Sequence, residues 1–308
     1  RVGGVITDAG IAFPLKQVEQ AAKDKSVKAV VVRIDSPGGT ITASDQLHQA
    51  LLHLRNGTSP RFADTGTKPL VASMGSVAAS GGYYVAMPAN KVVAEPTTIT
   101  GSIGVYAALP NVSKLADNAG IGLTLVKAGD LKAGGNPFLP ITEAERQPWQ
   151  EMVDHAYDRF LQVVADGRPG LTKDKLVHDR TTKQTPKYTD RGVPETGPDG
   201  KAVTVPVTRY RADGGTFTPP QARELGLIDD VADLPAAVKL AAGLANLDTY
   251  RAVTYEKQKT LTELVLGVDA KQPTHPLSAE AVGAALTPRV WYLTPSFEAA
   301  ATVAAPGR

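Results

Sequence analysis

One segment limits the possible folds more than any other, because residues 27–35 (VKAVVVRID) are apolar almost throughout. A strand of this kind is expected where helices cover both faces of a sheet, as they do in parallel sheets. Residues 70–74, 91–94 and 123–126 predict three further short strands. Helical patterns separate these segments, so the order predicts an α/β fold with a mostly parallel sheet.

The predicted helices differ in character. Residues 42–54 are amphipathic, residues 77–87 are rich in small side chains, and residues 236–247 are apolar. Thr142 and Glu145 have the spacing of a capping box, which predicts the start of a long helix ending near Gly167.

Composition excludes several classes of protein. With 33 Lys and Arg against 31 Asp and Glu, the 308 residues carry a formal net charge of +2, which gives no general electrostatic reason to bind nucleic acid. There is no cysteine, so disulfides, thiolate metal sites and a cysteine nucleophile are excluded. No stretch reaches the roughly 18 consecutive apolar residues of a membrane span. The chain begins at Arg1 rather than Met, and we expect that a signal peptide or N-terminal anchor preceded it.

Residues 181–211 differ from the rest of the chain. They are polar, rich in Gly and Pro, and carry a net charge of +3. Residues 203–207 are a candidate hairpin strand within an insertion that leaves the surface. The favoured interpretation is a tolerated surface loop. The alternative is a cationic flap that steers substrate or touches anionic lipid.

Three glycine-marked loops follow predicted strands, at residues 35–39 (DSPGG), 75–84 (GSVAASGGYY) and 100–104 (TGSIG). Sites in α/β folds lie at the carboxyl ends of the strands. Paired glycines let the backbone approach a ligand and expose its N–H groups. A helix that follows such a loop also directs the positive end of its dipole toward the ligand. Loops of this kind are suited to stabilising a developing oxyanion.

Ser80 is a candidate nucleophile, and the alternative is a helical hydroxyl packed among alanines. A serine nucleophile needs a base. None of the five histidines lies in a glycine-flanked loop, which disfavours a Ser-His-Asp triad. A lysine is then the remaining candidate base, provided that its surroundings disfavour the charged form. Lys132 follows the strand predicted at residues 123–126 and is one such lysine, although its position in a loop by itself favours an ordinary solvated residue.

In combination, these motifs resemble the signatures of the signal peptide peptidase A family of serine proteases. The resemblance is carried by residues 28–39, 73–84, 100–105 and 217–229, in that order. Residues 288–293 (PRVWYL) also resemble the end of short family members. The resemblance covers residues 2–240 and is interrupted by the insertion.

The resemblance implies a crotonase-like fold, also described as caseinolytic-protease-like, in which β-β-α units repeat as a superhelix around a mostly parallel sheet. We therefore expect a peptidase domain over residues 1–240 with a surface insertion at 181–211. Residues 241–308 are expected to form a C-terminal extension that is helical and makes contacts between subunits.

The resemblance also implies a Ser/Lys dyad, in which Ser80 is the nucleophile and Lys132 the base. The pattern GDLK at residues 129–132 ranks Lys132 above Lys127, although Leu131 stands where the family often has an aromatic residue. Ser102 is expected to hydrogen-bond Lys132 and orient it.

The oxyanion donors implied by the resemblance are the backbone N–H groups of Gly39 and Gly81, with Gly38 nearby. No metal ion or organic cofactor is implied.

The expected function is that of a membrane-associated serine endopeptidase, with its catalytic domain on the extracytoplasmic side, that degrades cleaved signal peptides and other unstructured peptides. Specificity is expected to favour small or apolar side chains. The single sequence unit favours a homo-oligomeric ring in which Ser80 and Lys132 of one site come from neighbouring subunits. The alternatives are a related protease that cuts other membrane proteins or phage scaffolds, a catalytically inactive relative that acts as a binding or assembly module, and a crotonase-type acyl-CoA enzyme.

Overall fold

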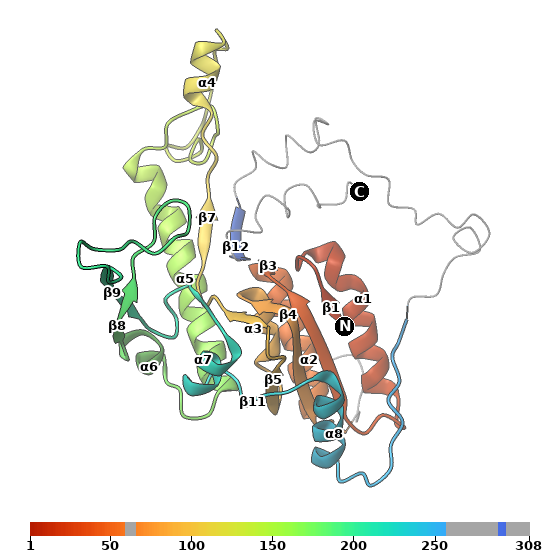
Figure 1. Cartoon of the computed structure of the whole chain (residues 1–308). Helices are drawn as coiled ribbons and strands as arrows, with labels where there is room; N and C mark the ends of the chain where they lie inside the picture. The colour runs from red at the N-terminus through yellow and green to blue at the C-terminus, as the bar shows by residue number, and fades with distance from the viewer. Residues whose placement is uncertain (59–65, 257–288, 294–308) are drawn as a thin grey trace, which may run out of the picture.

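The computed structural model describes residues 1–58, 66–256 and 289–293 (Figure 1). Among them, a central sheet has its strands in the order β1 (Val2–Gly3), β2 (Val30–Ser36), β4 (Leu70–Ala79), β5 (Lys91–Ala94) and β11 (Asp230–Val231), and every neighbouring pair is parallel. β6 (Ile99–Gly101) also pairs parallel with β4, whereas β10 (Thr216–Phe217) pairs antiparallel with β6. The predicted α/β class with a mostly parallel sheet is confirmed.

The central strand β4 is buried on both faces, as its apolar sequence predicts. Successive residues point to opposite faces, so Leu70 and Ala72 join the main core while Val71 joins a second, smaller core. The main core is formed with α1 (Asp8–Lys23), α2 (Ile41–Asn56), α3 (Gly81–Ala86) and α5 (Glu143–Gly167). The second core is formed with α8 (Leu234–Leu244).

A second, three-stranded sheet has the order β3 (Gly38–Thr40), β12 (Arg289–Leu293) and β7 (Tyr106–Ala108) (Figure 1). β12 is antiparallel to both of its neighbours. It comes from the region expected to be a helical extension. Of that region the structure describes residues 241–256 and 289–293, where α8 ends at Leu244 and residues 245–256 form neither helix nor strand.

The predicted insertion contains an antiparallel hairpin of β8 (Thr181–Pro186) and β9 (Thr204–Arg209), which pairs with no other strand among the described residues. The short helices α6 (Lys173–His178) and α7 (Pro219–Glu224) flank it along the chain. The division of the chain into a domain over residues 1–240 and an extension over 241–308 remains a prediction.

Most predicted elements are found, including the strands at 27–35, 70–74 and 91–94 and the capping box of Thr142 and Glu145 at the start of α5. The strand predicted at residues 123–126 is wrong. These residues lie between α4 (Ser113–Asn118) and α5 without a partner strand, and their side chains are exposed. The helix predicted at 77–87 is shorter than expected, because β4 continues through Ala79 to pair with β6. None of the described helices has the length and hydropathy needed to span a membrane.

Close packing of the end of α5 against the end of α3 makes Gly167 sensitive to substitution. A Cβ at Gly167 would lie 2.5 Å from the carbonyl oxygen of Met87. We expect Gly167→Ala to lower the free energy of unfolding by about 1–3 kcal/mol, the usual cost of overpacking, although alanine is the better helix former. The measurement is the midpoint of urea unfolding.

Gly243 is the matched control, since it also lies in a helix, α8, but has no atom within 4 Å of an added Cβ. Gly243→Ala is expected to leave stability unchanged or to raise it by up to about 1 kcal/mol, because only helix propensity acts there. Equal effects of the two substitutions would contradict this packing argument.

Candidate active site

Ser80 lies at the junction where β4 ends and α3 begins. Its backbone has φ 53° and ψ −118°, a conformation that side-chain-bearing residues rarely adopt. The Ser80 N–H donates to the carbonyl of Gly101 at 2.8 Å, and the Ser80 carbonyl accepts from the Tyr84 N–H at 2.9 Å. A strained strand-to-helix turn of this kind is how several hydrolases present a nucleophilic serine.

The pairing of β4 with β6 places Ser102 next to Ser80. β4 and β6 are aligned so that Ala79 is opposite Gly101, which brings the loop of Ser102 beside the Ser80 junction. Ser102 also has a positive φ of 51°, and its N–H donates to the Gly215 carbonyl at 2.8 Å. Among the described residues, Ser80 and Ser102 are two of three non-glycine residues with positive φ.

The glycines expected to donate to an oxyanion also lie at this junction. A Cβ placed on Gly38 would be 2.8 Å from the Gly81 nitrogen, so the two backbones are in close contact. The N–H of Gly38 already donates to Ser36 Oγ at 3.1 Å. Gly81 is the first residue of α3, and the first N–H groups of a helix have no acceptor within it. The N–H of Gly81 therefore has no acceptor within its own helix.

Two buried hydroxyls at this place, Ser80 Oγ and Ser44 Oγ, have no hydrogen-bond partner among the residues that the structure describes. Ser44 lies on α2, is fully buried, and would be 2.6 Å from a Cβ on Gly81. Leaving a buried hydroxyl unsatisfied costs about 1–3 kcal/mol. Unpartnered polar groups that gather in one place indicate a site rather than ordinary core packing.

Lys132 is not brought to Ser80 within one chain. It lies in the segment between α4 and α5 and its side chain is exposed, while Ser80 Oγ has no hydrogen-bond partner in the described part of the chain. The second candidate, Lys127, donates from its ammonium group to the Asp130 carbonyl at 2.7 Å. Neither lysine acts on Ser80 in the isolated chain.

The segment that carries Lys132 belongs to an arm formed by residues 113–141. β7 leads from the body of the protein to α4, which stands away from the sheet at the top of the view (Figure 1). The arm exposes large apolar side chains, namely Leu115, Ile121, Leu123, Leu125, Val126, Leu131 and Phe138. Val126 is 93% exposed. An apolar surface of this extent indicates a contact with another molecule.

His48 is a residue near the site that the sequence did not single out. It lies on α2 among Ser44, Leu47 and Leu51, at the spacing of a buried helix face. Its ring packs edge-on against Tyr84 with the ring centroids 5.1 Å apart, and its Nδ1 lies 3.3 Å from the Tyr84 carbonyl oxygen. Burial lowers the pKa of His48 to about 4, so the ring is neutral at pH 7.

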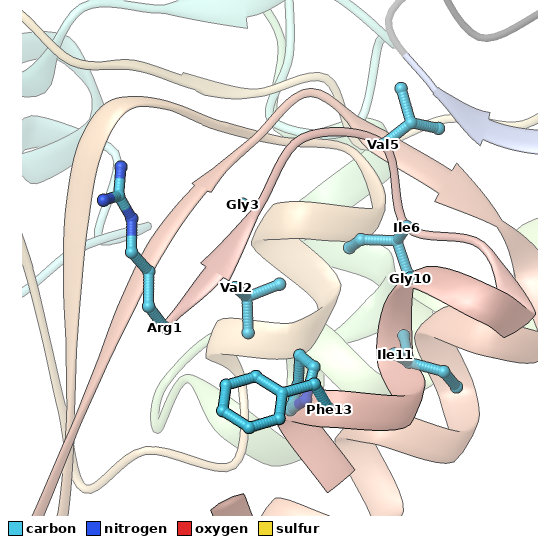
Figure 2. Close-up of a pocket in the computed structure, with 9 residues that line it drawn as sticks. Arg1, Val2, Gly3, Val5, Ile6, Gly10, Ile11 and Phe13 are labelled. Atoms are coloured by element: carbon cyan, nitrogen blue, oxygen red, sulfur yellow. The ribbon is translucent and has the colours of Figure 1, made fainter. Parts of the chain in front are cut away.

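Two surface cavities lie away from Ser80. One, of about 170 Å³, lies between β1 and the start of α1 and is lined by residues that include Val2, Ile6 and Phe13 (Figure 2). The other, of about 240 Å³, is lined by residues 96–99 and residues around β10. None of the predicted catalytic residues lines either cavity.

The fold and the site together define an α/β protein that presents a buried serine on a strained turn beside backbone N–H groups. Comparison with known proteins agrees with this class. The model of Peptidase family S49 matches residues 63–184. A putative protease of Synechocystis sp. is 31% identical over 273 residues, which cover 87% of this chain and 80% of the relative. The chain belongs to peptidase family S49.

Other relatives match over part of their length. A putative signal peptide peptidase SppA of Enterococcus faecium is 35% identical over 54% of this chain and 49% of its own. Protease 4 of Salmonella typhi is 30% identical over 81% of this chain, but the chain spans only 34% of that relative. A solved ClpP1 mutant from Listeria monocytogenes has a TM-score of 0.43 and 11% identity, covering 77% of this chain and 92% of that one.

The neutral state of His48 predicts a pH dependence of folding. In the unfolded chain His48 takes up a proton near pH 6.5, whereas in the folded chain it takes up this proton only near pH 4. Stability is therefore expected to fall as the pH falls through this window, by about 2 kcal/mol between pH 7.5 and pH 5 from this group alone. Urea unfolding at the two pH values measures the loss.

The same measurement on His48→Gln should show a smaller loss than in the wild type. His53→Gln is the control on the same helix, because His53 is only partly buried and faces Thr58. Asp45, Arg159 and Arg55 are the charged groups that act on His48, and both variants retain them. If His48→Gln loses as much stability between the two pH values as the wild type, the assignment of this pH dependence to His48 is refuted.

Proposed function

We propose that this protein is a serine endopeptidase in which Ser80 is the nucleophile and Lys132 of a neighbouring subunit is the general base. The observation that carries the proposal is the Ser80 junction itself, where a buried, unpartnered hydroxyl on a positive-φ residue adjoins the backbone of Gly38 and Gly81. Membership of peptidase family S49 supports the reaction class.

In the proposed reaction, Ser80 Oγ attacks the carbonyl carbon of the scissile peptide bond and its proton passes to Lys132. The negative charge that develops on the carbonyl oxygen is stabilised by the N–H groups of Gly39 and Gly81. The proton then passes to the leaving amine as the C–N bond breaks and a Ser80 ester forms. Water, deprotonated by Lys132, hydrolyses that ester and regenerates the serine. Ser102 orients Lys132 in this scheme.

Docking of the arm on a second copy of the chain would supply the missing base. Lysine acts as a base only where its charged form is disfavoured, and Lys132 is solvated in the isolated chain. The apolar side chains around it, such as Leu123, Leu125 and Leu131, favour burial against a partner. A homo-oligomeric ring would bury them and deliver Lys132 to the neighbouring Ser80.

The proposed substrates are cleaved signal peptides and other unstructured peptides at the membrane surface on its extracytoplasmic side. The name of the Enterococcus faecium relative, a putative signal peptide peptidase, supports this class. The site needs no metal ion or organic cofactor for the chemistry proposed.

Covalent labelling tests the dyad. A fluorophosphonate probe is expected to modify Ser80 in the assembled protein, located by peptide mass spectrometry. Lys132→Ala should reduce the labelling rate by at least about 100-fold, in keeping with the usual contribution of a general base. Lys127→Ala is the control and should label like the wild type.

Three outcomes would overturn parts of the proposal. Undiminished labelling in Lys132→Ala would remove Lys132 as the base, and a loss confined to Lys127→Ala would assign Lys127 instead. No labelling in a verified oligomer would favour a catalytically inactive relative that acts as an assembly module.

Mixing of subunits tests whether the site is shared. Ser80→Ala and Lys132→Ala are each expected to be inactive alone. Assembled together at equal ratio, they should regain about a quarter of wild-type activity, because random mixing places an intact Ser80 beside an intact Lys132 at one interface in four. Peptide hydrolysis by mixed rings, isolated through two different affinity tags, is the measurement. No recovery in such rings would contradict a shared site.

A further inference from the structure

Ser44 carries a buried hydroxyl that has no part in the proposed dyad. It lies in the first turn of α2, and its side chain is fully buried. A serine in a helix can donate to the carbonyl of the preceding turn. Ser44 Oγ makes neither that hydrogen bond nor any other within residues 1–58, 66–256 and 289–293, which the structure describes. The hydroxyl is therefore free to bind a group from outside the chain.

Other buried serines of this protein satisfy their hydroxyls. Ser36 Oγ accepts from the backbone N–H two residues further along the chain at 3.1 Å, and Ser73 Oγ accepts from the Arg33 guanidinium at 3.0 Å. A buried hydroxyl without a partner is costly, and each such group in a folded protein calls for an explanation. Ser44 and Ser80 depart from this pattern at the same place in the fold.

The hydroxyl of Ser44 faces the residue that follows the proposed nucleophile. α2 packs against α3 (Figure 1). The point where a Cβ on Gly81 would stand is 2.6 Å from Ser44 Oγ and 3.1 Å from the Cα of Gly38. Ser44 and Gly38 thus border the same space beside Gly81. A side chain at position 81 would collide with the Ser44 hydroxyl, so glycine keeps this space open.

A carbonyl group fits into this space. The carbonyl oxygen of Tyr292 lies 3.0 Å from the same point beside Gly81, yet Ser44 Oγ donates no hydrogen bond to it. A trigonal carbonyl therefore enters the space without engaging Ser44. When the carbonyl carbon of a substrate becomes tetrahedral, its oxygen moves and takes up negative charge. A donor that bonds only this displaced oxygen stabilises the transition state selectively.

We propose that the Ser44 hydroxyl is a third donor to the oxyanion, beside the N–H groups of Gly39 and Gly81. This inference rests on the proposed function, because it requires attack by Ser80. The Ser44 hydroxyl keeps its proton throughout and forms no covalent bond, so Lys132 remains the base. The hydroxyl gains its partner only when negative charge develops beside Gly81, which makes it part of a preorganised site.

The proposal predicts opposite effects of Ser44→Ala on stability and on reaction rate. Removal of an unpartnered buried hydroxyl, together with the higher helix propensity of alanine, should raise the midpoint of urea unfolding. Loss of one oxyanion donor should lower the rate at which Ser80 reacts by about 100-fold. A residue that served only packing would not separate the two effects.

The rate is measured as labelling of Ser80 by a fluorophosphonate probe in the assembled full chain, over a range of probe concentrations. The phosphoryl oxygen of the probe gains negative charge as Ser80 attacks the phosphorus and fluoride leaves, in the same way as the carbonyl oxygen of a peptide. Ser44→Ala should lower the maximal labelling rate about 100-fold. It should leave the half-saturating probe concentration unchanged, because the donor acts only in the transition state.

Ser73→Ala is the matched control. Ser73 is as deeply buried as Ser44, lies on β4, and accepts from Arg33. Its replacement should lower the midpoint of urea unfolding, because a hydrogen bond to a charged group is lost. It should leave the labelling rate unchanged. The two variants are therefore expected to change stability in opposite directions, with the slower reaction in the more stable one.

Three results with Ser44→Ala would overturn the inference. An unchanged maximal labelling rate in the folded oligomer would remove Ser44 from the oxyanion site. A slower reaction that arises only from a higher half-saturating concentration would assign Ser44 to binding of the probe before the reaction. A lower midpoint of urea unfolding would show that the hydroxyl has a partner in the folded protein.

Failure of this inference and failure of the proposed function are distinguishable. Labelling of Ser80 that depends on Lys132 but is as fast in Ser44→Ala as in the wild type would retain catalysis and overturn the role of Ser44. Absence of Ser80 labelling in verified wild-type oligomers would overturn the proposed function, and the role of Ser44 with it.

Discussion

The parallel pairing of β4 with β6 is the constraint on which the site depends. β4 runs beside β2 as far as Met74, and the register then shifts so that Ala78 lies opposite Ser36. The Val77 N–H, released by this shift, donates to Asp35 Oδ1 at 3.2 Å. From there β4 follows β6 and ends at Ala79, and the N–H of Ser80 donates to the Gly101 carbonyl. One continuous ladder therefore fixes Ser80, the proposed nucleophile, and the loop of Ser102, and it stabilises a positive φ at both residues.

The second sheet explains why an extended chain binds beside this junction. β3 follows β2 after a single residue and β7 follows β6 after a short loop, so both are positioned by the central sheet. Each would present an unpaired edge without β12, and unpaired edges are templates for strand addition. β3, which carries Gly38 and Gly39, thus forms one wall of the space that β12 fills. Burial of Tyr292 and Trp291 in that space follows from its shape and not from helix or strand propensity.

The sequence predicted the elements whose strand partners are close in the chain, and those whose apolar side chains are buried inside the chain itself. β2 and β5 were predictable because their apolar composition reflects burial on both faces. The extension of β4 to Ala79 was not, because a run of small residues fits a helix as well as a strand, and only pairing with β6 decides between them. β12 was missed because its partners, β3 and β7, are more than 180 residues away in the chain. Residues 123–126 have the alternating pattern of a strand but no partner strand among the described residues, and their exposed apolar side chains fit the proposed contact with a second subunit.

The separation of the proposed dyad between a buried serine and an exposed lysine has a physical reason. A buried hydroxyl without a partner costs about 1–3 kcal/mol, which a core of this size tolerates. A buried ammonium group without a partner costs several kcal/mol more. A chain that folds alone with Lys132 in water avoids the larger cost. In the proposed oligomer, burial of the apolar side chains of the arm would offset that cost. Desolvation would also disfavour the charged ammonium form of Lys132, and only the neutral amine can accept the proton of Ser80. Contact between subunits and activation of Ser80 would then be the same event.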